Sequence, residues 1–144
     1  MKIYLVGSLK DEEFPRIAER FREGGHEVFD DWRGGGADGD KRWRDYELNE
    51  RDRGYVEALQ APFAVNNREF DRTNIDKCDA VVAVCKPNKL PGISAVAELA
   101  YARWVKGTHA IILLNGEPHD WDLMLPLVVT RVCNNVEEVL EVLA

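Results

Sequence analysis

Four short apolar runs, spaced along the chain, restrict the folds that it can adopt. They are KIYLVGS (2–8), HEVFDD (26–31), DAVVAVC (79–85) and HAIILLN (109–115). Each run is rich in β-branched residues and nearly uninterrupted, which is typical of strands that are covered on both faces. A weaker run, LVVTRVC (127–133), predicts a fifth strand.

Segments with helical spacing lie between these runs. Residues 11–23, 93–106 and 135–143 repeat apolar side chains on one stripe, and Gly24-Gly25 is a normal stop for the first of these helices. Because strands and helices alternate, we expect an α/β fold, a doubly wound, flavodoxin-like or Rossmann-like domain. Its mostly parallel five-stranded sheet would carry helices on both faces. Ligands bind such folds beyond the carboxyl ends of the strands.

The chain of 144 residues suits one domain, spanning residues 1–144. Residues 32–65 are expected to form an inserted lid, because WRGGGADGDKRW (32–43) is glycine-rich and mixed in charge. Gly34, Gly36 and Gly39 match GxGxxG, but they do not follow a strand directly and open a helix, as a dinucleotide-binding fingerprint must. A flexible loop is the preferred interpretation.

Charge and hydropathy exclude several classes of partner. The 26 acidic and 19 basic residues give a net charge of −7, with the cations scattered singly, so we expect no binding to duplex nucleic acid. No apolar stretch approaches the roughly 18 residues that a membrane span needs, so no membrane partner is expected. Cys78, Cys85 and Cys133 are odd in number and lack CxxC spacing, which predicts buried thiols in a reducing, cytoplasmic location.

Several kinds of chemistry lack their motifs. Walker A, HExxH and GxSxG are absent, and His26, His109 and His119 are too widely separated to suggest a metal site. A phosphorelay receiver domain shares the expected fold, but it needs an aspartate at the end of the third strand. Here that strand ends Val84-Cys85-Lys86.

Glu98 stands out because it lies within GISAVAELAYA (92–102), a helical segment of small and apolar residues. Arg103 and Lys106 lie outside its sector of the helix, so no i+4 partner explains it as a surface pair. Its neighbours at about 100° per residue are Ser94, Ala95, Tyr101, Ala102 and Val105. The start of this helix should point at the ligand end of the sheet, where the helix dipole favours an ionised carboxylate. Glu98 is therefore a candidate nucleophile.

A second carboxylate candidate is Asp71, in EFDRTNIDKCDAVVAV. Taken alone, Asp71 is more readily explained as a surface charge or a helix cap. Asp76 and Asp79, in the same stretch, are interpreted as structural.

Taken together, these segments resemble a known family. DAVVAV, the loop after it and GISAVAELAYARWVKGTHAIILL are similar to nucleoside 2-deoxyribosyltransferases and the related 2′-deoxynucleoside 5′-monophosphate N-glycosidases. The opening KIYLVGSL and the EFD..N...CDAVV spacing agree with this resemblance. The likeness touches most of the chain outside residues 32–65.

The resemblance implies residue roles. Glu98 falls on the family's nucleophile, which attacks the anomeric carbon and forms a covalent glycosyl-enzyme, and Asp71 falls on the acid that helps the base to leave. Four residues fall where the family lines the sugar or phosphate pocket: Tyr4, Gly7, Ser8 and Ser94. Asp31, at the start of the loop that converges on the same end of the sheet, is a further candidate for substrate binding.

The chain also departs from the family. Gly92 stands where the family usually has Asp or Ser in contact with the sugar or phosphate, and 122–129 (DLMLPLVV) lacks the polar residue that a neighbouring subunit often contributes. Lys10, Arg33 and the 32–46 loop are expected to take over part of the binding of an anionic substrate.

The resemblance implies a homo-oligomeric enzyme, a dimer or larger, that needs no cofactor and no metal. It would cleave or transfer the N-glycosidic bond of (2′-deoxy)nucleosides or nucleotides. Two alternatives stay open: a non-catalytic module that senses nucleotides, and a hydrolase of NAD-type N-glycosides.

Overall fold

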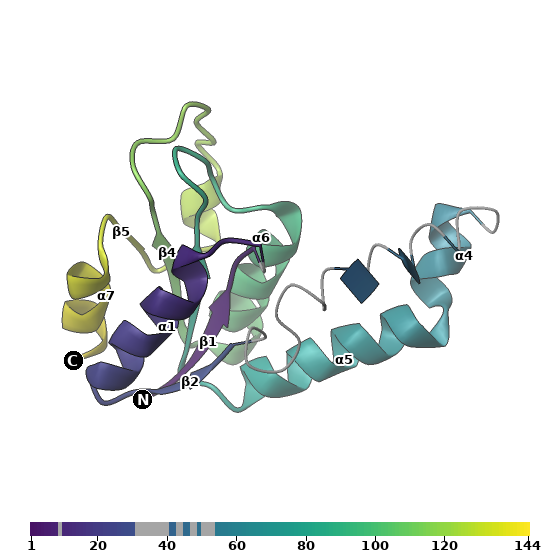
Figure 1. Cartoon of the computed structure of the whole chain (residues 1–144), viewed down its shortest axis with the longest axis horizontal. Helices are drawn as coiled ribbons and strands as arrows, with labels where there is room; N and C mark the ends of the chain where they lie inside the picture. Colours follow the sequence, from purple (N-terminus) through teal and green to yellow (C-terminus); the bar gives the residue numbers. More distant parts are fainter. Residues whose placement is uncertain (9, 31–40, 43–44, 47–48, 50–53) are drawn as a thin grey trace.

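A sheet of five parallel strands forms the centre of the molecule. The computed structural model describes residues 1–8, 10–30, 41–42, 45–46, 49 and 54–144. The strands are β1 (Lys2–Val6), β2 (Glu27–Phe29), β3 (Ala80–Val84), β4 (His109–Leu113) and β5 (Arg131–Cys133). They pair in the order β2-β1-β3-β4-β5, with every pair parallel (Figure 1). This confirms the predicted α/β fold with a flavodoxin-like strand order.

Helices cover both faces of this sheet. One face carries α1 (Glu13–Glu23) and α7 (Val136–Leu143), and the other carries α5 (Pro62–Asp76) and α6 (Ile93–Ala100) (Figure 1). The π-helix η2 (Tyr101–Lys106) continues α6, and the 3-10 helix η3 (Leu125–Leu127) precedes β5. Because β3 is central, all five of its residues are buried, as expected of a strand that is covered on both sides.

Two apolar clusters form the core, one on each face. On the first face Phe14 and Phe21 of α1 meet Val136 and Val139 of α7. On the second, Tyr4 of β1 meets Ala95 and Leu99 of α6 and Ile75 of α5. The predicted stripes of the first and last helices therefore face the sheet. Glu98 belongs to the second face.

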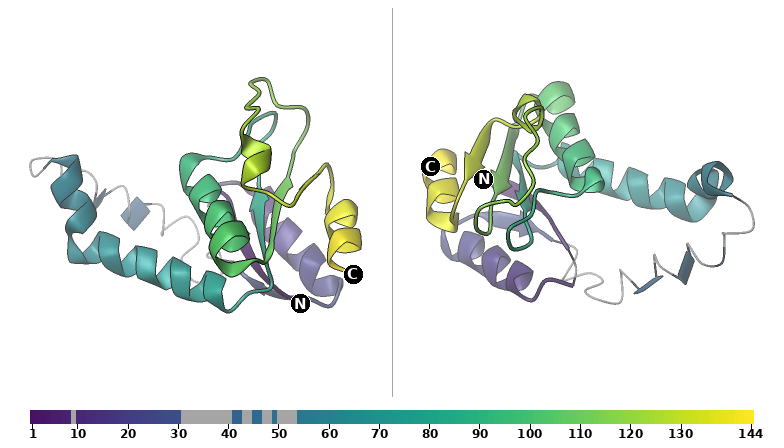
Figure 2. Two further views of the ribbon diagram at one scale, coloured as in Figure 1. Left: turned by 180° about the vertical axis from the view of Figure 1, so that it is seen from behind. Right: turned by 90° about the horizontal axis from the view of Figure 1, so that it is seen from above.

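Helix α5 extends well beyond the sheet and carries α4 (Tyr55–Gln60) at its outer end (Figure 2). Its inner end is fixed to η2 by two hydrogen bonds to Asp76. The Tyr101 hydroxyl donates to Oδ1 of Asp76 at 2.9 Å, and Nζ of Lys106 donates to its carbonyl oxygen at 2.9 Å. Asp76 is thus structural, as predicted, and it anchors the end of α5 that carries Asp71.

Two elements differ from the sequence expectations. The fifth strand is shorter than residues 127–133, because the chain forms η3 and Thr130 hydrogen-bonds to Ala110 before the β5 ladder starts. The predicted helix 93–106 changes from α to π geometry at Tyr101, which shifts its later side chains around the axis. As a result Val105, expected to lie beside Glu98, is exposed.

The three cysteines are buried and free of disulfides, as the sequence predicted. Burial raises the pKa of the Cys78 thiol and of the Cys85 thiol to about 11 each, so both are protonated at neutral pH. Among the described residues, no helix has the length and apolar character needed to cross a membrane.

Gly7 is required by packing at the end of β1. A Cβ there would lie 2.7 Å from Cε2 of Phe14 and 3.2 Å from the carbonyl oxygen of Val84. We expect Gly7→Ala to lower the free energy of unfolding by about 1–3 kcal/mol, because the buried ring of Phe14 must shift. Urea unfolding measures this change.

Gly92→Ser is the matched control, since a Cβ at Gly92 would meet nothing within 4 Å. A serine at this helix-capping position should change the free energy of unfolding by only a few tenths of a kcal/mol. Equal stability of the Gly7→Ala variant and the wild type would contradict the packing role of Gly7.

Candidate functional site

Glu98 projects from α6 toward the central strands. Ala95 and Leu99 of the same helix are buried against the sheet, which places Glu98 on the flank of the helix, beside β1. The Tyr4 hydroxyl donates a hydrogen bond to Oε1 of Glu98 at 3.2 Å, and Oε2 is shielded from solvent. Since Tyr4 is only 2% exposed, its hydroxyl holds the carboxylate in a fixed orientation.

A row of three aromatic rings leads from Glu98 to α5. The ring of Tyr4 stacks on that of Phe29 in β2, with 5.2 Å between the centroids and 14° between the planes. Phe29 in turn meets Phe70 of α5 at 5.8 Å and 57°. Asp71, partly buried, follows Phe70 directly in the helix. The contacts thus lead from Glu98 through three rings to Phe70, the residue that precedes Asp71 in the chain.

The loop that starts α6 is held by Asn88. Its backbone amide donates to the carbonyl oxygen of Asn115 at 2.8 Å, and its side-chain amide donates to that of Glu117 at 2.9 Å. The amide of His119 donates back to the Asn88 carbonyl oxygen at 3.0 Å. The loop after β3, which ends at Gly92, is therefore joined to the loop after β4.

Gly92 and Ser94 lie exposed at the N-terminus of α6. Gly92 is the N-cap, with a φ of −69° and a ψ of 167°, an extended conformation that any residue adopts. Ser94 lies one turn before Glu98, so both side chains occupy the same side of the helix. This pair brings a hydroxyl and the helix-end amides near the carboxylate.

The turn after β1 contains the remaining described candidates. Oγ of Ser8 accepts a hydrogen bond from the Lys10 amide at 3.4 Å, and the Ser8 carbonyl oxygen accepts one from the Asp11 amide at 3.0 Å. This turn starts α1, and Lys10 is exposed beside it. Asp31 and Arg33, the other two predicted site residues, lie outside the described residues.

Asp30, which the sequence did not single out, is the buried carboxylate at the end of β2. Arg22 of α1 pairs with it through a hydrogen-bonded ion pair and also donates to the carbonyl oxygen of Val28 at 3.2 Å. A buried ion pair of this kind fixes the geometry of the strand end. We interpret Asp30 as a structural residue at the edge of the site.

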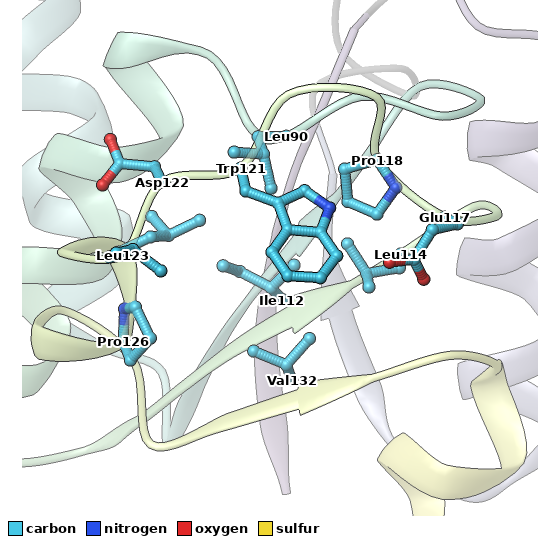
Figure 3. A pocket seen from close by; sticks show the side chains of 11 residues that line it. Leu90, Ile112, Leu114, Glu117, Pro118, Trp121, Asp122, Leu123, Pro126 and Val132 are labelled. Carbon is cyan, nitrogen blue, oxygen red and sulfur yellow. The ribbon is translucent and has the colours of Figure 1, made fainter.

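A cavity of about 260 Å³ lies elsewhere, over β4 and β5. Its lining is mainly apolar, with the indole of Trp121 across the opening and the carboxylates of Glu117 and Asp122 on opposite sides (Figure 3). Neither Glu98 nor Tyr4 nor Asp71 lines it. The cavity is therefore separate from the Glu98 site.

In the part of the chain that the structure describes, no group of three or more His, Cys, Asp or Glu side chains is arranged to hold a metal ion. His26 precedes β2, and burial lowers the pKa of its imidazole, which is consistent with the structural role predicted for it.

Solved structures share this fold. A 2-deoxyribosyltransferase from Bacillus psychrosaccharolyticus is 19% identical with a TM-score of 0.58, and the match covers 96% of this chain and 90% of the other. A CMP N-glycosidase from Clostridium botulinum is 20% identical with a TM-score of 0.54, covering 99% and 97%. A conserved protein from Enterococcus faecalis is 14% identical with a TM-score of 0.60, covering 98% and 95%.

No protein-family model and no curated protein matches the sequence. The likeness that the sequence shows to 2-deoxyribosyltransferases and N-glycosidases is thus confirmed in the fold. Two rings of the aromatic row, Phe29 and Phe70, were missed by the sequence analysis. The adjacency of Phe70 to Asp71 in EFD was the signal that could have identified one of them.

Proposed function

We propose that this chain is an enzyme that cleaves or transfers the N-glycosidic bond of (2′-deoxy)nucleosides or nucleotides, with Glu98 as nucleophile and Asp71 as acid. The contact that carries the proposal is the hydrogen bond from the buried Tyr4 hydroxyl to Oε1 of Glu98. It holds a carboxylate in one orientation on the flank of α6, as a reaction at a sugar carbon requires. The fold shared with a 2-deoxyribosyltransferase and a CMP N-glycosidase supports the same chemistry.

The first step makes one bond and breaks one. An oxygen of Glu98 attacks the anomeric carbon from the side opposite to the base, and the electron pair of the breaking C–N bond moves to the base nitrogen. Protonated Asp71 transfers its proton to the departing base. Because positive charge develops on the sugar ring, the anion below it and the acid beside the leaving group both lower the barrier.

The second step returns the enzyme to its starting state. Water or a second base attacks the same carbon, the bond to Glu98 breaks, and Asp71 accepts the proton that the attacking group loses. Two displacements retain the configuration at the anomeric carbon. Water as the second nucleophile makes the enzyme a hydrolase, whereas a base makes it a transferase.

The test is to incubate the protein with each deoxynucleoside, deoxynucleoside 5′-monophosphate, CMP and NAD, with and without a second base, and to separate the products by chromatography. Free base indicates hydrolysis, and a new nucleoside indicates transfer. Comparing Michaelis constants with and without the 5′-phosphate shows whether the site binds a phosphate. If NAD is the only compound that is converted, with release of nicotinamide, the NAD-type hydrolase is favoured. Binding without any turnover would favour the sensor.

We also propose that the protein forms a homo-oligomer through one exposed apolar surface. Nε1 of Trp104 donates a hydrogen bond to the Leu127 carbonyl oxygen at 3.0 Å. Leu127 directly follows the segment that lines the 260 Å³ cavity. Leu123, at 85%, is the most exposed residue of this surface. The members of this surface are Trp104, Val105, Trp121, Leu123, Met124, Leu127 and Val132. Apolar side chains gathered in this way are typical of a protein contact, and the family resemblance supports a second copy of the chain as the partner.

Leu123→Glu is expected to dissociate this oligomer, because a charge buried in an apolar interface is desolvated without a partner. Sedimentation velocity at roughly micromolar concentration should show a dimer or larger species for the wild type and a monomer for the variant. Tyr55→Glu on α4, which also replaces an exposed apolar residue, should leave the mass unchanged. A wild-type protein that sediments as a monomer would contradict the proposal.

A further inference from the structure

Phe70 presents an aromatic ring to solvent directly beside the candidate acid. The residue is 54% exposed, although its ring also meets Phe29 at 5.8 Å and a tilt of 57°. An exposed phenyl ring that is supported on one side by another ring is a ready surface for a flat ligand. Phe70 thus differs from a side chain that only fills the core.

The position of Phe70 relative to the two carboxylates defines what such a ligand would be. Glu98 lies at one end of the aromatic row, held by Tyr4, and Phe70 lies at the other end. In a displacement at the anomeric carbon, the leaving base lies on the side opposite to the nucleophile. A sugar over Glu98 therefore directs its base away from α6, and the rings of the row that lie beyond Tyr4 are those of Phe29 and Phe70.

Phe70 and Asp71 also approach a base in different ways. Adjacent residues of a helix point about 100° apart, so the two side chains cannot cover the same part of a ligand. A carboxyl group hydrogen-bonds to the edge of a base, where its ring nitrogens lie, whereas a phenyl ring contacts the face. The two residues are complementary in this respect.

We propose that the exposed ring of Phe70, supported by Phe29, stacks on the heterocyclic base of the substrate. This assignment rests on the proposed function, and it makes Phe70 a substrate-binding residue that favours flat aromatic leaving groups. Purines, which have the larger π-face, gain more from this contact than pyrimidines.

Phe70→Leu tests the contact, because leucine keeps an apolar side chain with good helix propensity and removes the ring. Removal of a stacking ring raises the dissociation constant of a base roughly 5- to 150-fold. We expect calorimetry with free adenine and free cytosine to show an increase in this range, larger for adenine. Phe70→Trp, which restores a ring, should bind within about threefold of the wild type.

Phe63→Leu is the matched control on the same helix. Phe63 stacks on Tyr46 with centroids 4.6 Å apart, and so belongs to another ring pair. Its loss should leave both dissociation constants unchanged. Thermal unfolding of all three variants identifies any general loss of structure.

A direct signature separates stacking from mere support of the Tyr4 ring. In the wild type, the protons of a bound base should shift upfield in the NMR spectrum through ring currents and show cross-relaxation with the Phe70 ring protons. Phe70→Leu should abolish both signals. Unchanged dissociation constants in that variant, or wild-type base protons that show neither signal, would overturn the proposal.

Free bases cannot react in the absence of a sugar donor, so this experiment is independent of turnover. Bases that bind through Phe70, in a protein that converts no nucleoside, would uphold the stacking contact and refute the proposed enzyme activity. Nucleoside turnover that is identical in Phe70→Leu, with unchanged affinity for the bases, would uphold the activity and refute the contact.

Discussion

Replacing Glu98 with alanine should lower kcat by roughly a thousandfold or more, because the variant has no oxygen to form the glycosyl-enzyme bond. Binding of the substrate should change little, since the sugar and base contacts remain. We therefore expect the substitution to lower kcat and to leave the Michaelis constant nearly unchanged. Steady-state kinetics on the best substrate of the wild type measures both constants.

Four further experiments make the result specific to Glu98. Glu98→Gln, which keeps the shape and removes the charge, should be nearly as inactive as alanine. Tyr4→Phe removes only the hydrogen bond of 3.2 Å to Oε1 and should cost roughly tenfold. A slow 2-fluorinated substrate should leave a sugar adduct on the peptide that contains Glu98, as mass spectrometry can detect. Glu117→Ala, on a separate loop, should retain full activity.

A fully active Glu98→Ala variant, or wild-type enzyme that carries no adduct during slow turnover, would refute the covalent mechanism. An inactive Glu117→Ala variant would instead indicate that removing a carboxylate lowers activity by disturbing the folded structure. Urea unfolding of each variant distinguishes these cases, because Glu98 is only partly buried and its truncation should have a small effect on stability.

Asp71→Asn should lower kcat by roughly 100- to 10,000-fold on natural nucleosides, the usual contribution of a positioned proton donor. The loss depends on the leaving group, which identifies the role of the residue. A base that leaves readily as an anion needs no proton, so the variant should regain most of its rate with such a substrate. Single-turnover measurements on a series of bases of decreasing pKa reveal this trend.

Asp76→Asn is the matched control for Asp71, five residues further along α5. Asp76 accepts a hydrogen bond from Tyr101 at 2.9 Å and anchors the helix. Asp76→Asn should therefore lower the stability of the fold, while the rate should depend on the leaving group as it does in the wild type. If Asp71→Asn loses the same factor with every base, Asp71 acts in binding or support and is not the proton donor.

The alternation of strands and helices around a parallel five-stranded sheet followed from local patterns, whereas the order of the strands did not. In β3 the run AVVAV is apolar at each position, and only a strand covered on both faces buries them all. The start of the fifth strand was harder to predict. Val128 and Val129 pack into the apolar cluster between the sheet and α6, although they belong to no strand. Local propensity does not distinguish burial in a strand from burial next to one.

The sequence identified those site residues whose charge is unusual for the segment in which they lie. Glu98 conflicted with an apolar helix, and the structure places it beside a buried Tyr4 hydroxyl. Phe70 conflicted with nothing, because an aromatic side chain in a helix is ordinarily explained by packing and does not by itself indicate a ligand. Its contact with Phe29 joins residues more than forty positions apart, and such contacts follow from tertiary packing alone.

Because of the π-helix after Ala100, the direction in which Glu98 points depends on the number of residues between α6 and Gly107. The far end of this turn is fixed, since Gly107 adopts a φ of 68° and both the amide and the hydroxyl of Thr108 bond to the Ala102 carbonyl oxygen. A chain one residue shorter here would close as ordinary α-helix and rotate residues 93–100 by about 100°. Glu98 would then swing away from Tyr4. Indels between two fixed points can thus inactivate a protein without altering any residue of its site.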